Sequence, residues 1–67
     1  MAVARVTRIT ASSTVGWQEA VHEGLQRATK TIRGITGLEI VNQKAKVVEG
    51  EISEYRVTID LTFILEG

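Results

Sequence analysis

Residues 53–65 read SEYRVTIDLTFIL, and two kinds of side chain alternate through the whole stretch. The odd-numbered positions are Ser53, Tyr55, Val57, Ile59, Leu61, Phe63 and Leu65, and the even-numbered ones are Glu54, Arg56, Thr58, Asp60, Thr62 and Ile64. Successive side chains of a β-strand point to opposite faces of its sheet. The stretch is therefore predicted to form a long strand with one apolar face, which needs a cover, and one polar face.

An amphipathic helix from Trp17 to about Arg33 is predicted to supply that cover. Apolar residues recur there at steps of three and four, which is the spacing of one helix face; they are Trp17, Val21, Leu25, Ala28, Ile32 and Ile35. The Ser/Thr cluster before the segment, or Gly16 with Glu19 three residues later, signals its beginning. Gly34 is typical of the left-handed residue that follows a helix.

Two further strands are expected. Residues 3–10 combine β-branched and polar side chains and are followed by the strand-breaking run 11–14, while residues 36–48 form the second strand. The apolar positions of the second strand change parity near Ile40 and Val41. A change of parity predicts a β-bulge or a strong bend at that point.

Residues 48–51 are predicted to form a tight hairpin turn, with Gly50 supplying a positive φ. The expected order is β-α-β-β, with the second and third strands antiparallel and the first strand pairing with the third. The fold class is therefore α+β, with a three-stranded antiparallel sheet wrapped around one helix. We expect one domain over residues 1–67.

The small size of the chain predicts self-association. In a domain of 67 residues, the free energy gained by burying one apolar core is about equal to the conformational entropy cost of folding. The sequence has no Cys for a disulfide, and its one His is too little for a structural zinc site. We therefore expect an oligomer, and no metal cluster.

Composition also argues against several classes of function. Eight basic residues balance eight acidic ones, so the chain lacks the broad positive field that favours nucleic acid or an anionic membrane. The first ten residues lack the apolar core of a signal peptide and are too polar for a membrane span, which favours a soluble cytoplasmic protein. The serines have no base or orienting acid in sight, so we assign no catalytic residue and expect no enzyme.

Two distinctive residues have structural explanations. Trp17 lies on the apolar stripe of the helix and is expected to pack in the core or in a subunit interface. His22 falls on the polar face with Glu19 and Glu23 nearby, where a solvated surface is the simplest reading. Neither residue is predicted to bind a ligand.

The ordered motifs of the chain resemble the dodecins. The resemblance rests on WQEAVHEGLQRATKTIRGI in the helix, LEIVNQ in the second strand, the EG turn and the closing YRVTIDLTFILEG, and it covers essentially the whole sequence. It implies a β-α-β-β protomer, twelve copies of which assemble into a hollow shell, a homododecamer. In the best-known members, pairs of flavins are buried between the subunits.

The resemblance also implies a set of site residues. Flavin-binding dodecins stack a Trp on the isoalloxazine ring, and Gly37 occupies that position here. The other cofactor-binding positions map onto Thr36, Glu39, Asn42, Gln43 and Arg56. Asn42 replaces an acidic residue of some members, whereas Arg56 offers a planar guanidinium that can donate to flavin carbonyls.

Two functions follow as alternatives. In the first, the assembly binds and stores or sequesters riboflavin or FMN and performs no reaction. In the second, Gly37 has abolished flavin stacking, and the assembly has a structural role, associates with calcium or holds another cofactor such as coenzyme A. Glu39, Glu51, Glu54 and Asp60 could provide oxygen ligands in that case, although the sequence has no compact calcium-binding loop.

Overall fold

The computed structural model describes residues 3–65. Within these residues the elements are β1 (Ala4–Ser13), α1 (Trp17–Thr29), β2 (Ile35–Val48) and β3 (Glu51–Ile64). The predicted order β-α-β-β and the α+β class are therefore confirmed.

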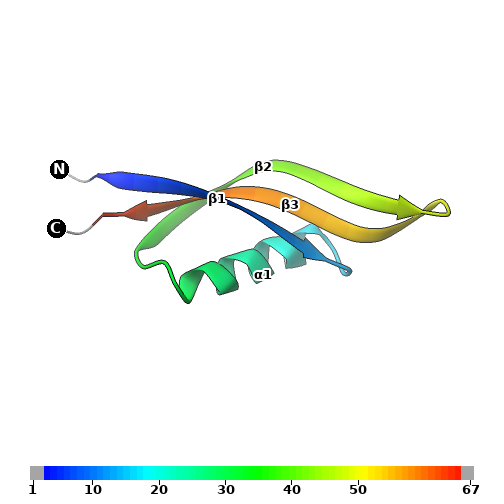
Figure 1. The fold of residues 1–67 in the computed structure, drawn as a ribbon, viewed down its shortest axis with the longest axis horizontal. Coiled ribbons are helices and arrows are strands. Elements are labelled where there is room, and N and C mark those ends of the chain that lie inside the picture. Colours follow the sequence, from blue (N-terminus) through cyan, green and yellow to red (C-terminus); the bar gives the residue numbers. More distant parts are fainter. Residues whose placement is uncertain (1–2, 66–67) are drawn as a thin grey trace.

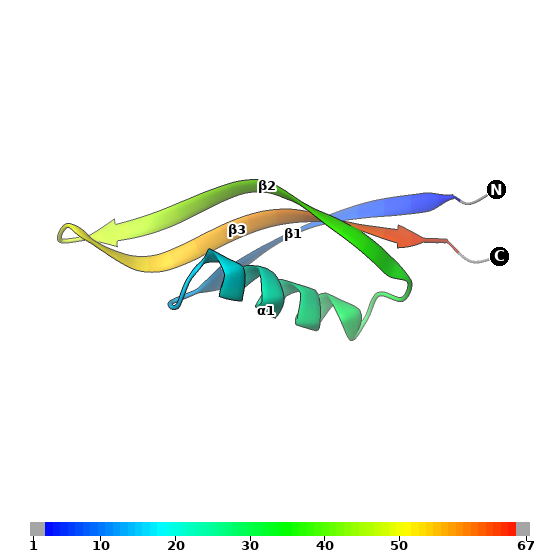
Figure 2. The same ribbon diagram turned by 180° about the vertical axis from the view of Figure 1, so that it is seen from behind.

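The strands form one antiparallel sheet in the described part of the chain, in the order β1-β3-β2. The predicted pairing of the first strand with the third is confirmed, and β3 is the central strand. Figures 1 and 2 show α1 lying along one face of this curved sheet, while the β2–β3 hairpin extends beyond the helix. The molecule is elongated, with extents of 52 × 20 × 13 Å.

The core lies between α1 and the odd-numbered face of β3. Val57, Ile59 and Leu61 are fully buried, as the alternation predicts. In the register of the sheet, Ile59 lies between Ile9 of β1 and Ile40 of β2. We call the side of the sheet that carries these residues the helix face, and the opposite side the outer face.

Small residues bring α1 close to the sheet. Ala20, Gly24 and Ala28 are the buried residues of the helix, at steps of four, whereas Val21 and Leu25 are only half-buried. A Cβ atom on Gly24 would lie 3.0 Å from the Cβ atom of Ala11. The contact line is thus displaced from the larger side chains of the predicted stripe, because close approach requires small ones.

The helix ends at Thr29, before the predicted limit near Arg33. One looser turn follows, in which the backbone N–H groups of Thr31 and Ile32 both bond to the Ala28 carbonyl. The β-branched residues of this stretch favour the helix less than the preceding ones do. Gly34 does have the predicted left-handed conformation, with φ of 74°, and its carbonyl accepts a bond from the Ile64 N–H at 3.0 Å.

The first strand is longer than predicted. It continues through residues 11–13, which pair with the β3 residues Val57, Arg56 and Tyr55. Tertiary pairing with the long central strand therefore overrides the low strand preference of this small-residue run. The helix begins directly after Gly16, and no side-chain hydrogen bond caps it.

The predicted irregularities of the β2–β3 hairpin are confirmed. The register shifts between Ile40 and Asn42, and Gly50 has a φ of 80° in the turn. Further shifts lie between Ile35 and Gly37 and between Lys46 and Val47. These shifts decide which side chains of β2 share a face.

Strand β2 is an edge strand that α1 leaves uncovered. The helix packs on β1 and β3, and every residue of β2 after Ile35 is exposed. The exposed residues include large apolar ones, namely Leu38, Ile40, Val41, Val47 and Val48. An apolar edge of this kind is unusual for a protein that remains a monomer.

Candidate functional site

Four of the six predicted site residues, including Gly37 opposite Thr62, share the outer face of the sheet. Glu39 lies opposite Asp60, and Asn42 lies opposite Thr58. Arg56 has the same parity as Thr58 and Asp60 on β3, opposite to that of the buried Val57. The protomer therefore brings Glu39, Asn42 and Arg56 onto one surface.

The bulge in β2 makes this arrangement possible. Glu39 and Asn42 are three residues apart and would point to opposite faces of a regular strand. The register shift between Ile40 and Asn42 inserts one extra residue, so both side chains reach the outer face. The sequence signal for this feature was the change of apolar parity at Ile40 and Val41.

Gln43 and Thr36 are placed differently. Gln43 lies opposite the buried Val57, on the helix face, where it lines a hollow of about 250 Å³ together with Trp17 and Ile40. Thr36 falls within the register shift between Ile35 and Gly37. Within one protomer, Gln43 therefore lies on the opposite face of the sheet from Asn42.

Gly37 has room for a side chain. It lies opposite Thr62 near the beginning of β2, and a Cβ atom added to it would meet no atom within 4 Å. Its backbone is not in the left-handed region, since the positive-φ glycines among the described residues are Gly34 and Gly50. Nothing in the protomer therefore demands glycine at this position.

Arg56 is held by a neighbouring carboxylate. Its Nη2 atom donates to Glu54 Oε1 at 2.9 Å, and this hydrogen bond lowers the pKa of Glu54. Lys44 lies directly opposite Arg56, and Lys46 lies opposite Glu54. These four residues line a shallow hollow of about 300 Å³ with an excess of positive charge.

The flavin-site residues that the resemblance implied did not include Lys44 and Glu54, although Glu54 was among the possible calcium ligands. The alternation of β3 already put Glu54 and Arg56 on one face, so the ion pair had a sequence signal. Lys44 shares that face only because of the bulge, and its exact partner depends on the register. Register across a hairpin follows from the turn and from the irregularities of both strands, which a single sequence specifies poorly.

A second ion pair crosses the outer face. Arg8 Nε donates to Asp60 Oδ1 at 2.7 Å, and Arg8 Nη2 donates to Asp60 Oδ2 at 3.1 Å. This pairing lowers the pKa of Asp60 and raises that of Arg8. The hydroxyls of Thr10 and Thr58 also lie within 3.2 Å of each other.

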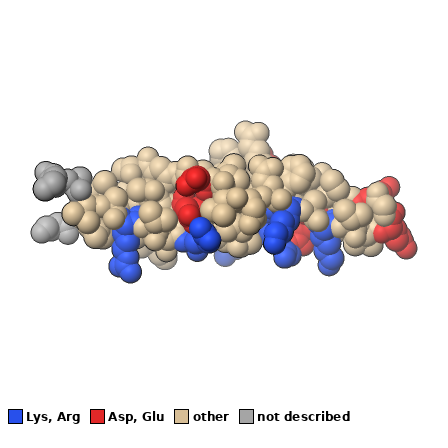
Figure 3. Space-filling model, turned by 90° about the horizontal axis from the view of Figure 1, so that it is seen from above, with Lys and Arg blue, Asp and Glu red and all other residues tan. Residues whose placement is uncertain are grey.

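Figure 3 looks onto the outer face, where basic and acidic side chains lie side by side along the molecule. The carboxylates at one end of this view belong to the region of the β2–β3 turn. The surface thus presents positively charged hydrogen-bond donors and negatively charged acceptors next to one another. This is a surface suited to a ligand or partner with several polar groups.

The donor set fits part of a flavin. The Arg56 guanidinium can donate to ring carbonyls, and the side chains of Glu39 and Asn42 can bond to the hydroxyls of a polyol chain. The aromatic ring that would stack on the isoalloxazine is missing at Gly37. The protomer therefore provides polar recognition on the outer face but no aromatic platform at that position.

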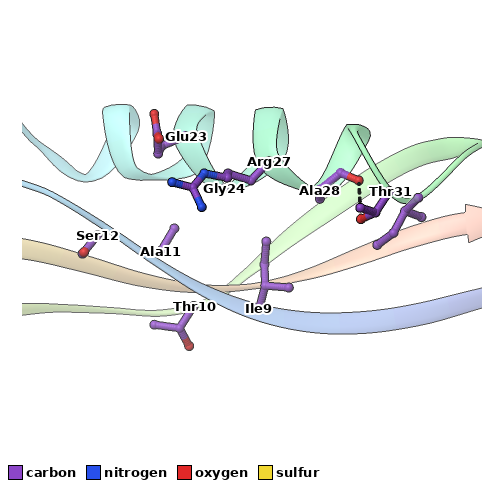
Figure 4. Close-up of a pocket in the computed structure, with 10 residues that line it drawn as sticks. Ile9, Thr10, Ala11, Ser12, Glu23, Gly24, Arg27, Ala28 and Thr31 are labelled. Carbon is purple, nitrogen blue, oxygen red and sulfur yellow. Dashed lines mark hydrogen bonds between the residues drawn. The ribbon is translucent and has the colours of Figure 1, made fainter.

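A larger hollow lies elsewhere, between α1 and β1, with a volume of about 500 Å³. Figure 4 shows Ala11 pointing toward Gly24 at its floor, with the Arg27 side chain extended along the helix above it. None of the six predicted site residues lines this hollow. It belongs to the other side of the sheet from Glu39, Asn42 and Arg56.

Residues 3–65 of the protomer contain neither a membrane-spanning helix nor a preformed metal centre. No helix in this part of the chain has the length and apolar character needed to cross a membrane. No group of three or more His, Cys, Asp or Glu side chains among these residues is placed to hold a metal ion within one protomer.

Solved structures of dodecins are similar to this fold. A dodecin from Streptomyces davaonensis has 29% sequence identity and a TM-score of 0.92, with 98% of this chain and 97% of that chain covered. A variant of the dodecin from T. thermophilus has 27% identity and a TM-score of 0.94, with both chains fully covered.

A third similar structure, from Mycobacterium tuberculosis, is a calcium-chelating immunodominant antigen described as a calcium dodecin with a novel calcium-binding site. It has 28% identity and a TM-score of 0.81, with 96% of this chain and 91% of that chain covered. No curated protein sequence matches the chain.

The family model named Dodecin matches residues 3–66 of the sequence. This range includes all four elements of the fold and the bulged strand that carries Glu39 and Asn42. The expectation drawn from the motifs is therefore confirmed, and the chain belongs to the dodecin family.

Proposed function

We propose that this dodecin binds riboflavin or FMN and stores or sequesters it in a hollow homododecamer, without performing a reaction. The observation that carries the proposal is the shared outer face of Glu39, Asn42 and Arg56, beside the open position of Gly37. Thr36 and Gln43 complete the proposed cofactor-binding set, with Gln43 acting from the helix face of a protomer.

Self-association is supported by the exposed surface. The chain exposes 5119 Å², whereas a compact monomer of 7.3 kDa is expected to expose about 4,200 Å². The excess of about 900 Å² is close to the roughly 800 Å² that each partner contributes to a standard interface. The apolar side chains of β2 are among the exposed groups that a second copy would cover.

The flavin proposal is tested by titrating riboflavin and FMN with the protein and following flavin fluorescence. A flavin ring buried against protein groups loses fluorescence, so quenching that saturates at a fixed ratio of flavin to protein is expected. Native mass spectrometry of the same samples reports the assembly. An intact assembly without quenching at micromolar protein would contradict flavin binding.

Calcium is the second candidate ligand, and the similar structure from M. tuberculosis favours it. The absence of a stacking ring at Gly37 also supports a role without flavin. Carboxylates such as Glu39 and Glu54 from several copies would have to converge on the ion. Calorimetric titration with Ca²⁺, with Mg²⁺ as the control, tests this role, and coenzyme A can be titrated in the same way.

A further inference from the structure

The segment of β2 that carries Asn42 and Gln43 is held to the sheet of the protomer along one side only, by β3. Its register with β3 is interrupted before Asn42 and again after Lys46, so residues 42–46 form a short ladder between two irregularities. The strand is exposed throughout this stretch, and α1 packs on β1 and β3. A short edge ladder of this kind opens easily in a single protomer unless a contact from the helix, or from a second copy in the assembly, fixes it.

Trp17 provides such a contact at the middle of the segment. Its indole Nε1–H donates to the backbone carbonyl of Lys44 at 2.9 Å. Its ring also packs edge-on against Tyr55, with 4.9 Å between the ring centroids and an angle of 79° between the planes. Trp17 is the first residue of α1, so it connects the helix with both strands of the hairpin.

The contact acts on residues of the proposed site. Lys44 follows Gln43 directly, and Gln43 lines the same hollow as Trp17. The Lys44 side chain lies opposite Arg56, and Asn42 lies two pairs further along the same ladder, on the same face. The polar groups of a binding site must be held to within about 0.5 Å of their productive positions. A contact that holds residues 42–46 in place is therefore expected to affect ligand affinity.

We propose that Trp17 is a positioning residue of the candidate flavin site, which holds the Asn42–Lys46 segment of β2 through the indole bond to the Lys44 carbonyl. This inference rests on the proposed function. We assign Trp17 to the support of β2, because its N–H donates to the Lys44 carbonyl and its ring packs against Tyr55.

The test compares the full-length wild-type protein with Trp17→Phe and Leu25→Ala. Phenylalanine keeps an aromatic ring for Tyr55 but removes the N–H donor. Leu25→Ala is the matched control, since it removes a half-buried side chain from the same helix and leaves the indole bond in place. Native mass spectrometry establishes that all three proteins form the same assembly.

Hydrogen exchange of backbone amides is the first readout. Loss of one hydrogen bond is expected to raise exchange in residues 42–46 about threefold to tenfold in Trp17→Phe, with residues 35–40 unchanged. Leu25→Ala should not raise exchange selectively in residues 42–46. Equal protection in Trp17→Phe and the wild type, or the same selective loss in Leu25→Ala, would overturn the inference.

Riboflavin affinity is the second readout. The dissociation constant of Trp17→Phe is expected to rise by a similar factor, while that of Leu25→Ala stays near the wild-type value. Unchanged affinity in Trp17→Phe, despite faster exchange, would overturn the positioning role. If the wild type binds no flavin, the proposed function fails, and the exchange result alone then decides whether Trp17 holds the strand.

Discussion

Arg8 and Asp60 face each other across β1 and β3, and the guanidinium donates to both carboxylate oxygens, at 2.7 and 3.1 Å. The pair lies on the outer face, with the Asp60 side chain 19% exposed and the Arg8 side chain 61% exposed. It ties an edge strand to the central strand on the surface that also carries Glu39 and Arg56.

The first prediction concerns acid stability. Because the Arg8 hydrogen bond lowers the pKa of Asp60 in the folded state, the folded protein binds fewer protons there than the unfolded chain does. The stabilising effect is complete above the unfolded pKa of about 3.9 and is lost as the pH falls through the lower, folded pKa. The hydrogen bond from Arg56 likewise lowers the pKa of Glu54, so the stabilisation from this pair is also lost in acid.

We therefore expect the free energy of unfolding of the wild type to decrease as the pH is lowered from about 5 towards 2. Asp60→Asn should weaken this dependence, and Glu51→Gln, at the hairpin turn, is the control. Urea denaturation at a series of pH values and one protein concentration measures the effect. Identical pH profiles for Asp60→Asn and the wild type would show that the ion pair does not contribute.

The second prediction tests the close contact between α1 and β1. In Gly24→Ala the new Cβ atom would lie 3.0 Å from Ala11 Cβ and 3.4 Å from Ile9 Cδ1. Better helix propensity contributes about 1 kcal/mol in favour of alanine, but overpacking costs about 1–3 kcal/mol. Because Ala11 lies on a paired strand and cannot rotate away, we expect a net loss of about 1 kcal/mol.

Urea denaturation of Gly24→Ala, Ala11→Gly and the double variant measures this contact. The double variant should recover part of the loss, because it removes the atom that the new methyl group meets. Additive effects of the two substitutions would show that the helix and the strand do not meet at this point.

The fold was predictable where one strong periodicity decided the structure. The alternation of residues 53–65 identified the buried face with Val57, Ile59 and Leu61, and the parity change near Ile40 located the bulge. Ala28 was part of the predicted stripe, but Ala20 and Gly24 were missed, because hydrophobic periodicity favours large side chains, whereas close packing of a helix on a sheet selects small ones.

The candidate site was predictable only in part. The resemblance to dodecins implied Glu39, Asn42, Gln43 and Arg56, but the faces of the β2 residues among them depend on register shifts, and the change of apolar parity marked only one of these shifts. The bond from Trp17 to the Lys44 carbonyl joins residues far apart in the sequence and involves a backbone acceptor. Because every residue has a backbone carbonyl, the type of residue at position 44 gives no sign of this bond.

The third prediction compares two isoleucines that are neighbours in the sheet. Ile59 is fully buried, whereas its partner Ile40 is 44% exposed in the protomer. Ile59→Ala should cost about 2–5 kcal/mol of folding free energy. Ile40→Ala should leave the secondary structure intact but weaken self-association, because a second copy is proposed to cover β2.

Circular dichroism and native mass spectrometry at decreasing protein concentration separate the two effects. We expect Ile40→Ala to dissociate at higher concentration than the wild type does. If Ile40→Ala keeps the assembly of the wild type over the whole dilution series, the apolar edge of β2 is not an interface.

The last prediction restores the missing aromatic platform. A Trp side chain at Gly37 has open space in the protomer, because a Cβ atom there meets nothing within 4 Å. Stacking of a planar ring on an aromatic side chain contributes about 1–3 kcal/mol, so Gly37→Trp should raise riboflavin affinity roughly five- to 150-fold. Gly37→Leu adds bulk without a flat ring and serves as the control, with little gain expected. Quenching of flavin fluorescence measures the dissociation constants. If Gly37→Trp forms the wild-type assembly and its flavin affinity is no higher than that of Gly37→Leu, the site does not lie at Gly37, and the polar groups of Glu39, Asn42 and Arg56 serve another ligand.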